Sequence, residues 1–196
     1  MLVAAASAAH AQSSVTLYGR LDARGQGREA GVQLTYSAAL FQLRGIYDEI
    51  RNPANGVLND VFQYSREYFA GANVFLGPVK LQAAYQASHA SNVAAGAPST
   101  TQLEWGGVTW QATPAAALIG AVYHVNANNG GGNATIYTVG GSYNLSKRTL
   151  LDVQVATVRN SKAGTFSLEA NLPGNADNPL AGHSLSGVYA GIQHSF

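Results

Sequence analysis

The fold is decided by residues 79–86, VKLQAAYQ, in which apolar and polar side chains alternate. In a β-strand the first, third, fifth and seventh of these residues would lie on one face, and Lys80, Gln82 and Gln86 on the other. The same alternation recurs in residues 41–48, 119–126 and 137–145. The pattern predicts strands that separate an apolar environment from a polar one.

Composition narrows the class of protein. Of 196 residues, 46% are hydrophobic and only 11% charged, against roughly 25% charged in an ordinary soluble domain. A net charge of +1 argues against nucleic acid as a partner, and the lack of cysteine excludes disulfides and thiolate chemistry. No stretch reaches the roughly 18–20 apolar residues of a membrane-spanning helix. A β-barrel reconciles low charge with the lack of such a helix, because only one face of each strand meets lipid.

Ten strands are expected, joined alternately by short turns and longer loops. Their predicted ranges are 14–22, 31–37, 39–50, 65–76, 79–89, 101–111, 116–126, 134–144, 149–159 and 184–196. A soluble β-sandwich is the alternative, but its strands are usually about half as long. We therefore predict an all-β, antiparallel transmembrane β-barrel with short periplasmic turns and long external loops. Its first and last strands should pair, because an open edge in lipid leaves backbone groups unsatisfied.

The N-terminus differs in character from the remainder of the chain. Residues 1–11, MLVAAASAAHA, are small and apolar and end in an A-x-A cleavage pattern, although no basic residue precedes Arg20. We interpret them as the remainder of a signal peptide, with a disordered alanine-rich leader as the alternative. Residues 12–196 are then expected to form a single barrel domain.

Three segments resemble Gram-negative general porins of the betaproteobacterial and Neisseria-like group. Residues 14–23, SVTLYGRLDA, resemble the first strand of these porins, and 187–196, GVYAGIQHSF, their last strand. Residues 137–149, YTVGGSYNLSKRT, resemble their repeated strand–turn pattern. The first strand, 14–22, joins near 24–30 to what resembles a porin C-terminal half at 31–196. The chain therefore resembles a porin shortened by an internal deletion.

The resemblance implies several properties. It implies a location in the bacterial outer membrane, a full barrel of about sixteen strands, and a channel that needs no cofactor. It also implies a homotrimer, although the strands that would form the trimer interface are missing. Finally, it implies that the terminal Phe196 is recognised by the outer-membrane insertion machinery.

Strand parity selects the candidate site residues. Charged side chains are costly in hydrocarbon, so those in strands should face the lumen. The predicted pore-lining residues are Arg20, Asp22, Arg44, Asp48, Lys80 and Asp152. The predicted membrane-interface and assembly residues are Tyr18, Tyr143, His194 and Phe196. We also expect His124 to face the lumen, and assign no face to Glu104 and Trp105, because a bulge could form at Gly106-Gly107.

Two functions remain open at this stage. The first is passive diffusion of small hydrophilic solutes and ions, biased by Arg20, Arg44 and Lys80 rather than by the loop at 160–183. The alternative is a truncated or closed structural barrel, a porin remnant without a useful pore. An enzyme is not expected, because the five histidines are scattered and form no metal-binding or catalytic motif.

Overall fold

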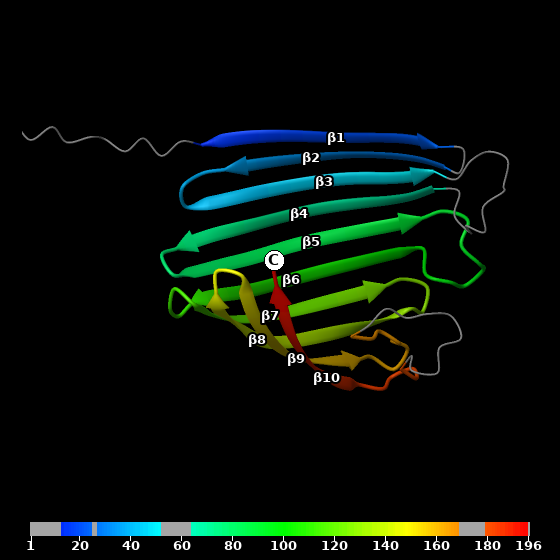
Figure 1. Ribbon diagram of the computed structural model, residues 1–196. Coiled ribbons are helices and arrows are strands. Elements are labelled where there is room, and N and C mark those ends of the chain that lie inside the picture. Colours follow the sequence, from blue (N-terminus) through cyan, green and yellow to red (C-terminus); the bar gives the residue numbers. More distant parts are fainter. Residues whose placement is uncertain (1–12, 25–26, 52–63, 169–178, 196) are drawn as a thin grey trace, which may run out of the picture.

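Ten strands form a single antiparallel sheet in the computed structural model, which describes residues 13–24, 27–51, 64–168 and 179–195. They are β1 (Ser14–Arg24), β2 (Gly27–Ser37), β3 (Phe41–Arg51), β4 (Tyr64–Leu76), β5 (Val79–Ala90), β6 (Thr100–Gln111), β7 (Ala116–Ala127), β8 (Gly132–Ser146), β9 (Thr149–Asn160) and β10 (Leu185–His194). Each strand pairs with its neighbours in sequence, so the sheet is a simple meander (Figure 1). The predicted antiparallel ten-stranded sheet is confirmed.

The strand ends differ most from the prediction in one region. Residues 24–30, expected to be an irregular join, mostly belong to β1 and β2, which pair from Ser14 with Ser37 to Arg24 with Gly27. The other short turns lie on the opposite rim, which we call the turn rim. There Gly77 has φ 59°, a left-handed conformation that favours glycine, between β4 and β5. The ends of β3, β5, β7 and β9 lie at the other rim, which we call the loop rim.

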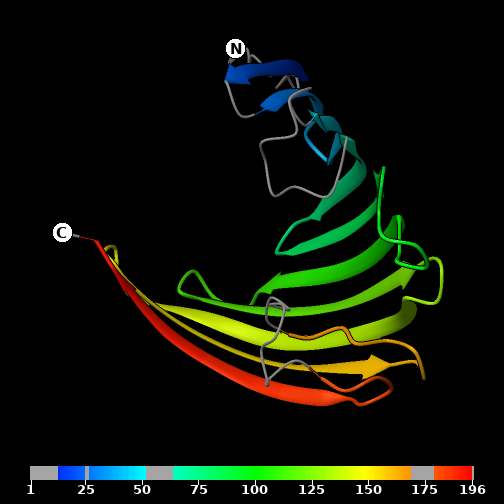
Figure 2. The ribbon, with the colours of Figure 1, turned by 90° about the vertical axis from the view of Figure 1, so that its right-hand side faces the viewer.

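The sheet curves strongly but does not close. Seen along the strands, it forms an arc with β1 and β10 at its two ends (Figure 2). No described residue of β1 pairs with β10. The predicted closure between these strands is therefore wrong for this chain by itself, because an arc with this curvature needs more than ten strands to complete a circle. Within the described residues, no helix has the length and apolarity to cross a membrane.

The register carries the alternation of one strand across the whole sheet. Leu81 lies opposite Val74 on β4 and Val108 on β6, so these residues share the convex face. Large apolar side chains exposed on this face include Leu17, Leu34, Leu43, Leu81, Val108, Leu118, Val139, Val155 and Val188. An apolar surface of this extent, facing outward, suits contact with lipid rather than water.

The few buried apolar residues lie on the other, concave face. Val125, Ala134 and Val158 are buried, and Val158 is fully so. Phe166 and Leu168 pack against them from the connection between β9 and β10. The core therefore lies inside the curve of the sheet and only over its C-terminal strands.

Candidate functional site

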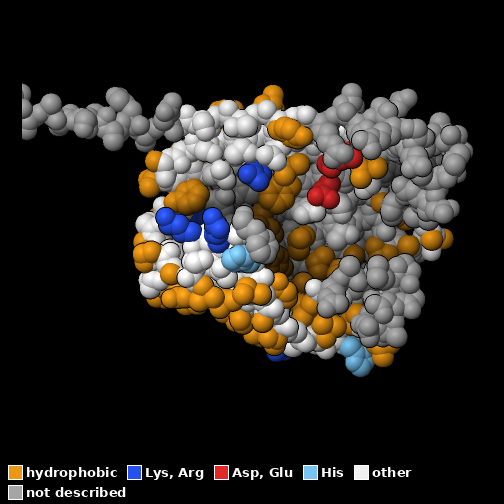
Figure 3. Space-filling view, viewed as in Figure 1, with side chains coloured by type: hydrophobic (Ala, Val, Ile, Leu, Met, Phe, Trp, Pro, Cys, Tyr) orange, Lys and Arg blue, Asp and Glu red, His pale blue; other side chains and the backbone are white. Residues whose placement is uncertain are grey.

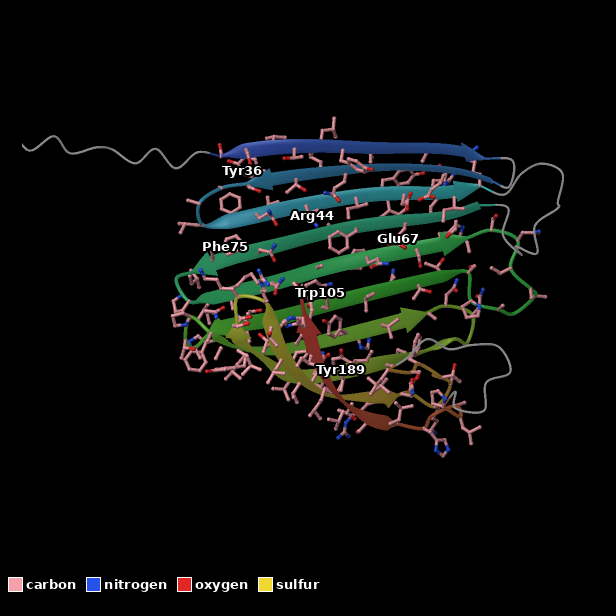
Figure 4. The ribbon with its side chains drawn as sticks, viewed as in Figure 1. Tyr36, Arg44, Glu67, Phe75, Trp105 and Tyr189 are labelled. Carbon is pink, nitrogen blue, oxygen red and sulfur yellow. The ribbon has the colours of Figure 1, made fainter. Side chains whose placement is uncertain are left out.

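The concave face of β3–β6 forms a polar hollow. It is lined by Gln42, Arg44, Asn73, Gln82 and Trp105, among others. The Asn73 amide donates to Gln42 Oε1 (3.1 Å), and the Gln42 amide donates to Ser37 Oγ (3.0 Å). Arg44 and Trp105 point into this space (Figure 4). The hydrogen bonds hold these polar side chains in place, so the hollow has a polar lining.

Charge on this face is separated along the strand direction. Arg44 and Lys80 lie toward the turn rim, whereas Asp48 lies directly opposite Glu67 toward the loop rim. Figure 3 shows basic side chains at the left end of the hollow and acidic ones at its right end. Arg44 and Asp48 are four residues apart, about 13 Å along the strand. That separation exceeds the screening length of about 8 Å at physiological salt. The basic and acidic zones therefore act as distinct local fields.

Four of the six predicted lining residues occupy this face. The register places Arg44, Asp48 and Lys80 on the concave side of β3 and β5, and Asp152 on that of β9. The remaining two belong to β1, where Arg20 pairs with Gly31 and Asp22 with Glu29; the side chains of Arg20 and Asp22 lie outside the described residues. The roles of all six in lining a pore stay predictions. Glu67 also lies on the concave face, but it was not predicted to line the pore. The three consecutive apolar residues 68–70 that follow it hide the alternation of polar and apolar side chains.

A loop that packs into the concave face was not predicted from the sequence. Residues 161–168, which we call the insert, leave β9 and turn inward. The Asn160 side chain fixes them: its Nδ2 donates to the carbonyls of Phe166 and His183 (both 2.8 Å), and its Oδ1 accepts from the Phe166 amide (3.0 Å). One side chain thus joins both described ends of the β9–β10 connection. The only sequence signal was the pair of apolar residues, Phe166 and Leu168, in an otherwise small and polar stretch.

Two glycines allow the insert to lie against β8. Gly132 has φ 74°, and a Cβ there would come within 2.5 Å of the Gly164 nitrogen. A Cβ on Gly164 would come within 2.7 Å of the Asn133 carbonyl oxygen. The Ser161 amide donates to the same Asn133 oxygen (2.8 Å). The insert therefore rests on the backbone of β8 rather than on side chains alone.

The insert explains a wrong prediction for His124. His124 lies opposite Glu104 on the convex face, and its Nδ1 shares a hydrogen bond with Thr135 Oγ1 (3.0 Å). The sequence prediction put it in the lumen because its alternate neighbours, such as Tyr123 and Val125, are apolar. Those neighbours instead lie on the concave face, where the insert covers Val125. The residues of β7 that share the parity of Tyr123 and Val125 thus face inward.

The faces of Glu104 and Trp105 are also settled. Register runs without a shift through Gly106 and Gly107 on both sides of β6, so β6 has no bulge there. Trp105 lies on the concave face, stacked on Tyr123 with ring centroids 5.7 Å apart. Among the described strand pairs, the irregularity falls between β8 and β9, near Asn144.

A charged cluster lies at the edge of the apolar convex surface that is nearest the loop rim. Glu49 lies near the loop rim, and its side chain is only 12% exposed. Arg51 Nε donates to Glu49 Oε1 (2.6 Å), the Tyr47 hydroxyl donates to Oε2 (2.7 Å), and Arg66 Nε lies 3.5 Å from Oε1. On the side of this cluster that faces the turn rim, the ring centroids of Tyr47 and Tyr68 are 5.2 Å apart. Charged side chains next to an aromatic pair are typical of the boundary between lipid headgroups and hydrocarbon.

The predicted interface residues fall in different places. Tyr143 lies on the convex face near the turn rim and is 50% exposed. His194 lies on the same face, where its Nδ1 shares a hydrogen bond with Thr149 Oγ1 (2.9 Å). Tyr18 pairs with Gln33 on the concave face, and its role at the membrane interface stays a prediction. Phe196 lies outside the described residues.

These features define a class of protein. A sheet with an apolar convex face, a polar concave face and aromatic residues near its rims is the wall of a membrane β-barrel with a wet interior. In the described part of the chain, no three His, Asp or Glu side chains group as a metal site would require.

Comparison with known proteins gives the family. The Gram-negative porin family matches residues 23–163. The chain therefore belongs to the Gram-negative porin family, whose members are β-barrel proteins of the outer membrane. A search of curated proteins finds no match.

Solved structures agree on the fold. The anion-selective porin from Comamonas acidovorans superposes with a TM-score of 0.71 at 24% sequence identity. The alignment covers 86% of this chain and 49% of that porin, so the chain spans about half the length of its structural relative. This relation also accounts for the open arc, since the sheet corresponds to only part of a porin wall.

Proposed function

We propose that this chain forms part of the wall of a water-filled pore for passive diffusion of small hydrophilic solutes and ions. The observation that carries the proposal is the polar concave hollow around Arg44, Asn73 and Gln82, set against an apolar convex face. Passage through such a pore requires neither catalysis nor a cofactor. Bore and lining charge then determine which solutes pass.

The lining charges predict weak selectivity. Arg44 and Lys80 favour anions, while Asp48 and Glu67 oppose them nearer the loop rim. The Comamonas porin is described as anion-selective. For this chain we infer a weaker anion preference, because its concave face carries both signs and its net charge is only +1.

Reversal of the basic lining tests the proposal. The refolded protein is placed in a planar bilayer, and its reversal potential is measured in a salt gradient. Replacing Arg44 and Lys80 by Glu should shift the potential toward cation preference. The matched control replaces Arg51 and Arg159, which lie on the convex face, by Glu. An equal shift from both pairs would mean that the concave face does not line the conduction path.

The alternative of a truncated or closed structural barrel without a useful pore also has support. The insert occupies part of the concave face, which would narrow a pore, and the open arc between β1 and β10 is what a truncated barrel would show. A bilayer that stays silent, together with heat-modifiable migration of the folded protein on a gel, would favour a structural barrel or remnant over a channel.

We further propose that Phe196 acts in assembly, through recognition by the insertion machinery and by anchoring the strand end at the interface. Deletion of Phe196 should lower the inserted fraction in cells more than it lowers refolding in detergent. Equal losses in both would make it a packing residue only. The homotrimer stays an expectation of the family resemblance.

A further inference from the structure

A pocket lies on the concave face of β7–β10, next to the polar hollow of β3–β6. Its volume is about 490 Å³, which is within the range of pockets that bind small molecules. The four strands form its floor, and the insert lies over them on the inner side of the arc (Figure 2). The side chains that matter for the argument are Tyr123, Thr138, Gln154, Ser167, Leu168 and Tyr189. The proposed function makes no use of this pocket.

Two tyrosines provide aromatic surface on opposite sides of the pocket. Tyr189 on β10 lies over Gly191, where a Cβ would come within 2.5 Å of the tyrosine hydroxyl and 3.0 Å of its Cζ. The glycine therefore lets the ring lie against the backbone, and because Tyr189 is 58% exposed, its other face is open to the concave space. Tyr123 on β7 stacks on Trp105, which lines the polar hollow. The faces of such rings carry partial negative charge and attract C–H groups.

Between the tyrosines the pocket carries amide and hydroxyl groups. Gln154 Nε2 donates to Thr138 Oγ1 (2.8 Å), and the Thr138 hydroxyl donates to the Val155 carbonyl (3.3 Å), so the amide is held on the pocket floor. None of the described residues that line the pocket is charged. Toward the turn rim, Asp152 lies beside the Tyr189 hydroxyl, since the same Cβ on Gly191 would come within 2.8 Å of Asp152 Oδ1. A carboxylate in this place accepts hydrogen bonds from hydroxyl groups and repels anions.

We propose that this pocket binds a neutral sugar. A sugar ring combines an apolar C–H face, which stacks on tyrosine, with hydroxyl groups around its edge, which pair with the Gln154 amide and the Tyr189 hydroxyl. An anionic solute would instead meet Asp152 and find no cation among the described lining residues. The inference rests on the proposed function only for access, because the sugar reaches the concave face through the same water-filled space.

The test measures binding without conduction, by titration calorimetry of the protein in a detergent that has no sugar headgroup. The probes are maltose, the anionic sugar glucuronate, and sorbitol, an acyclic polyol with hydroxyl groups but no ring. We expect maltose to bind several-fold more tightly than the other two. Equal binding of maltose and sorbitol would overturn the proposal, as would tighter binding of glucuronate or a complete lack of maltose binding. Tighter binding of indole would overturn it in favour of a site for aromatic solutes.

Variants locate the binding. Tyr189→Ala removes an exposed ring and Gln154→Ala the pocket amide, and each should weaken maltose binding several-fold. The matched control is Tyr137→Ala, because Tyr137 is 46% exposed on the convex face of β8, beside Thr138 in sequence. It should leave the affinity unchanged. Circular dichroism verifies the strand content of each variant. An unchanged affinity in both pocket variants, or an equal loss in the control, would overturn the assignment.

Bilayer conductance of the same protein separates this proposal from the channel function. Maltose binding by a protein that stays silent in the bilayer would uphold the sugar site while contradicting the channel. Conduction by a protein that does not bind maltose would overturn the sugar site and leave the channel in place.

Discussion

The N-terminal and C-terminal halves of the sheet use their concave faces differently. Over β3–β5 the concave face is bare and polar, with Arg44, Asp48 and Lys80 along it. Over β7–β9, near the loop rim, it carries an apolar cluster that is partly covered by the insert, which packs against the buried Val125 and Val158. The same alternating pattern therefore reflects two arrangements in one sheet. In one half the apolar residues of each strand face lipid, and in the other half some face lipid and others pack into a small internal core.

The largest effect is expected from a charge in that core. Val158→Asp should lower the free energy of unfolding by about 3 kcal/mol or more, because an unpaired carboxylate would replace a fully buried side chain. Gln82→Asp, on the bare half of the same face, should change it by about 1 kcal/mol or less. Denaturant titration of the protein in detergent measures both. Similar losses would mean that the two halves do not differ as described.

Removal of the Asn160 side chain should have an intermediate effect. Asn160→Ala deletes three hydrogen bonds to the two described ends of the β9–β10 connection, at a cost of about 1–3 kcal/mol. A cysteine at Leu168 should then react several-fold faster with a hydrophilic maleimide, because the insert is released. Asn73→Ala, which removes one hydrogen bond in the bare half, is the control and should leave that labelling unchanged. Unchanged labelling in both variants would show that Asn160 does not hold the insert.

The two tryptophans test the faces with little change in stability. Trp105 lies on the concave face, and Trp110 on the convex face, where it is 47% exposed. In vesicles of brominated phospholipid, Trp105→Phe leaves Trp110 as the only emitter, and most of its fluorescence should be quenched. Trp110→Phe leaves Trp105, whose emission should respond to aqueous iodide instead. Each substitution should cost about 1 kcal/mol or less. The opposite quenching pattern would invert the face assignment.

The smallest effect is expected at His124. His124→Leu places an apolar side chain on the outer surface and removes the hydrogen bond to Thr135, so stability should change by about 0.5 kcal/mol or less. The reversal potential in a salt gradient should be the same in both proteins. A difference between them would place His124 in the lumen.

The sequence was sufficient where each strand has one wet and one lipid-facing side. In β5 and in residues 41–48 of β3 the charged residues lie on one side only and identify the wet side, so the faces of Arg44 and Lys80 follow from alternation alone. In β7 no charged residue breaks the pattern, and small and apolar residues occur on both faces, such as Ala121 on the concave face and Val122 on the convex face. Which face of β7 points inward then depends on packing with Phe166, roughly forty positions away in the sequence. No local sequence pattern reveals this packing.

Closure failed as a prediction for a related reason. Alternation and turn lengths fix how each strand pairs with the next, and these pairings are confirmed throughout the described sheet. They do not fix the curvature, which depends on twist and strand tilt over the whole wall. Whether β1 pairs with β10 therefore depends on the circumference of the whole sheet, which cannot be predicted from any single strand.

The meander has a consequence for how such proteins change over generations. Every contact between described strands joins neighbours in the chain. A gene that loses or duplicates one hairpin therefore leaves the remaining hairpins with intact partners, and alters only the girth of the structure. Loss of a single strand would instead reverse the direction of all that follow and send external loops to the periplasm. Insertions and deletions that preserve this architecture are therefore expected to add or remove strands in pairs.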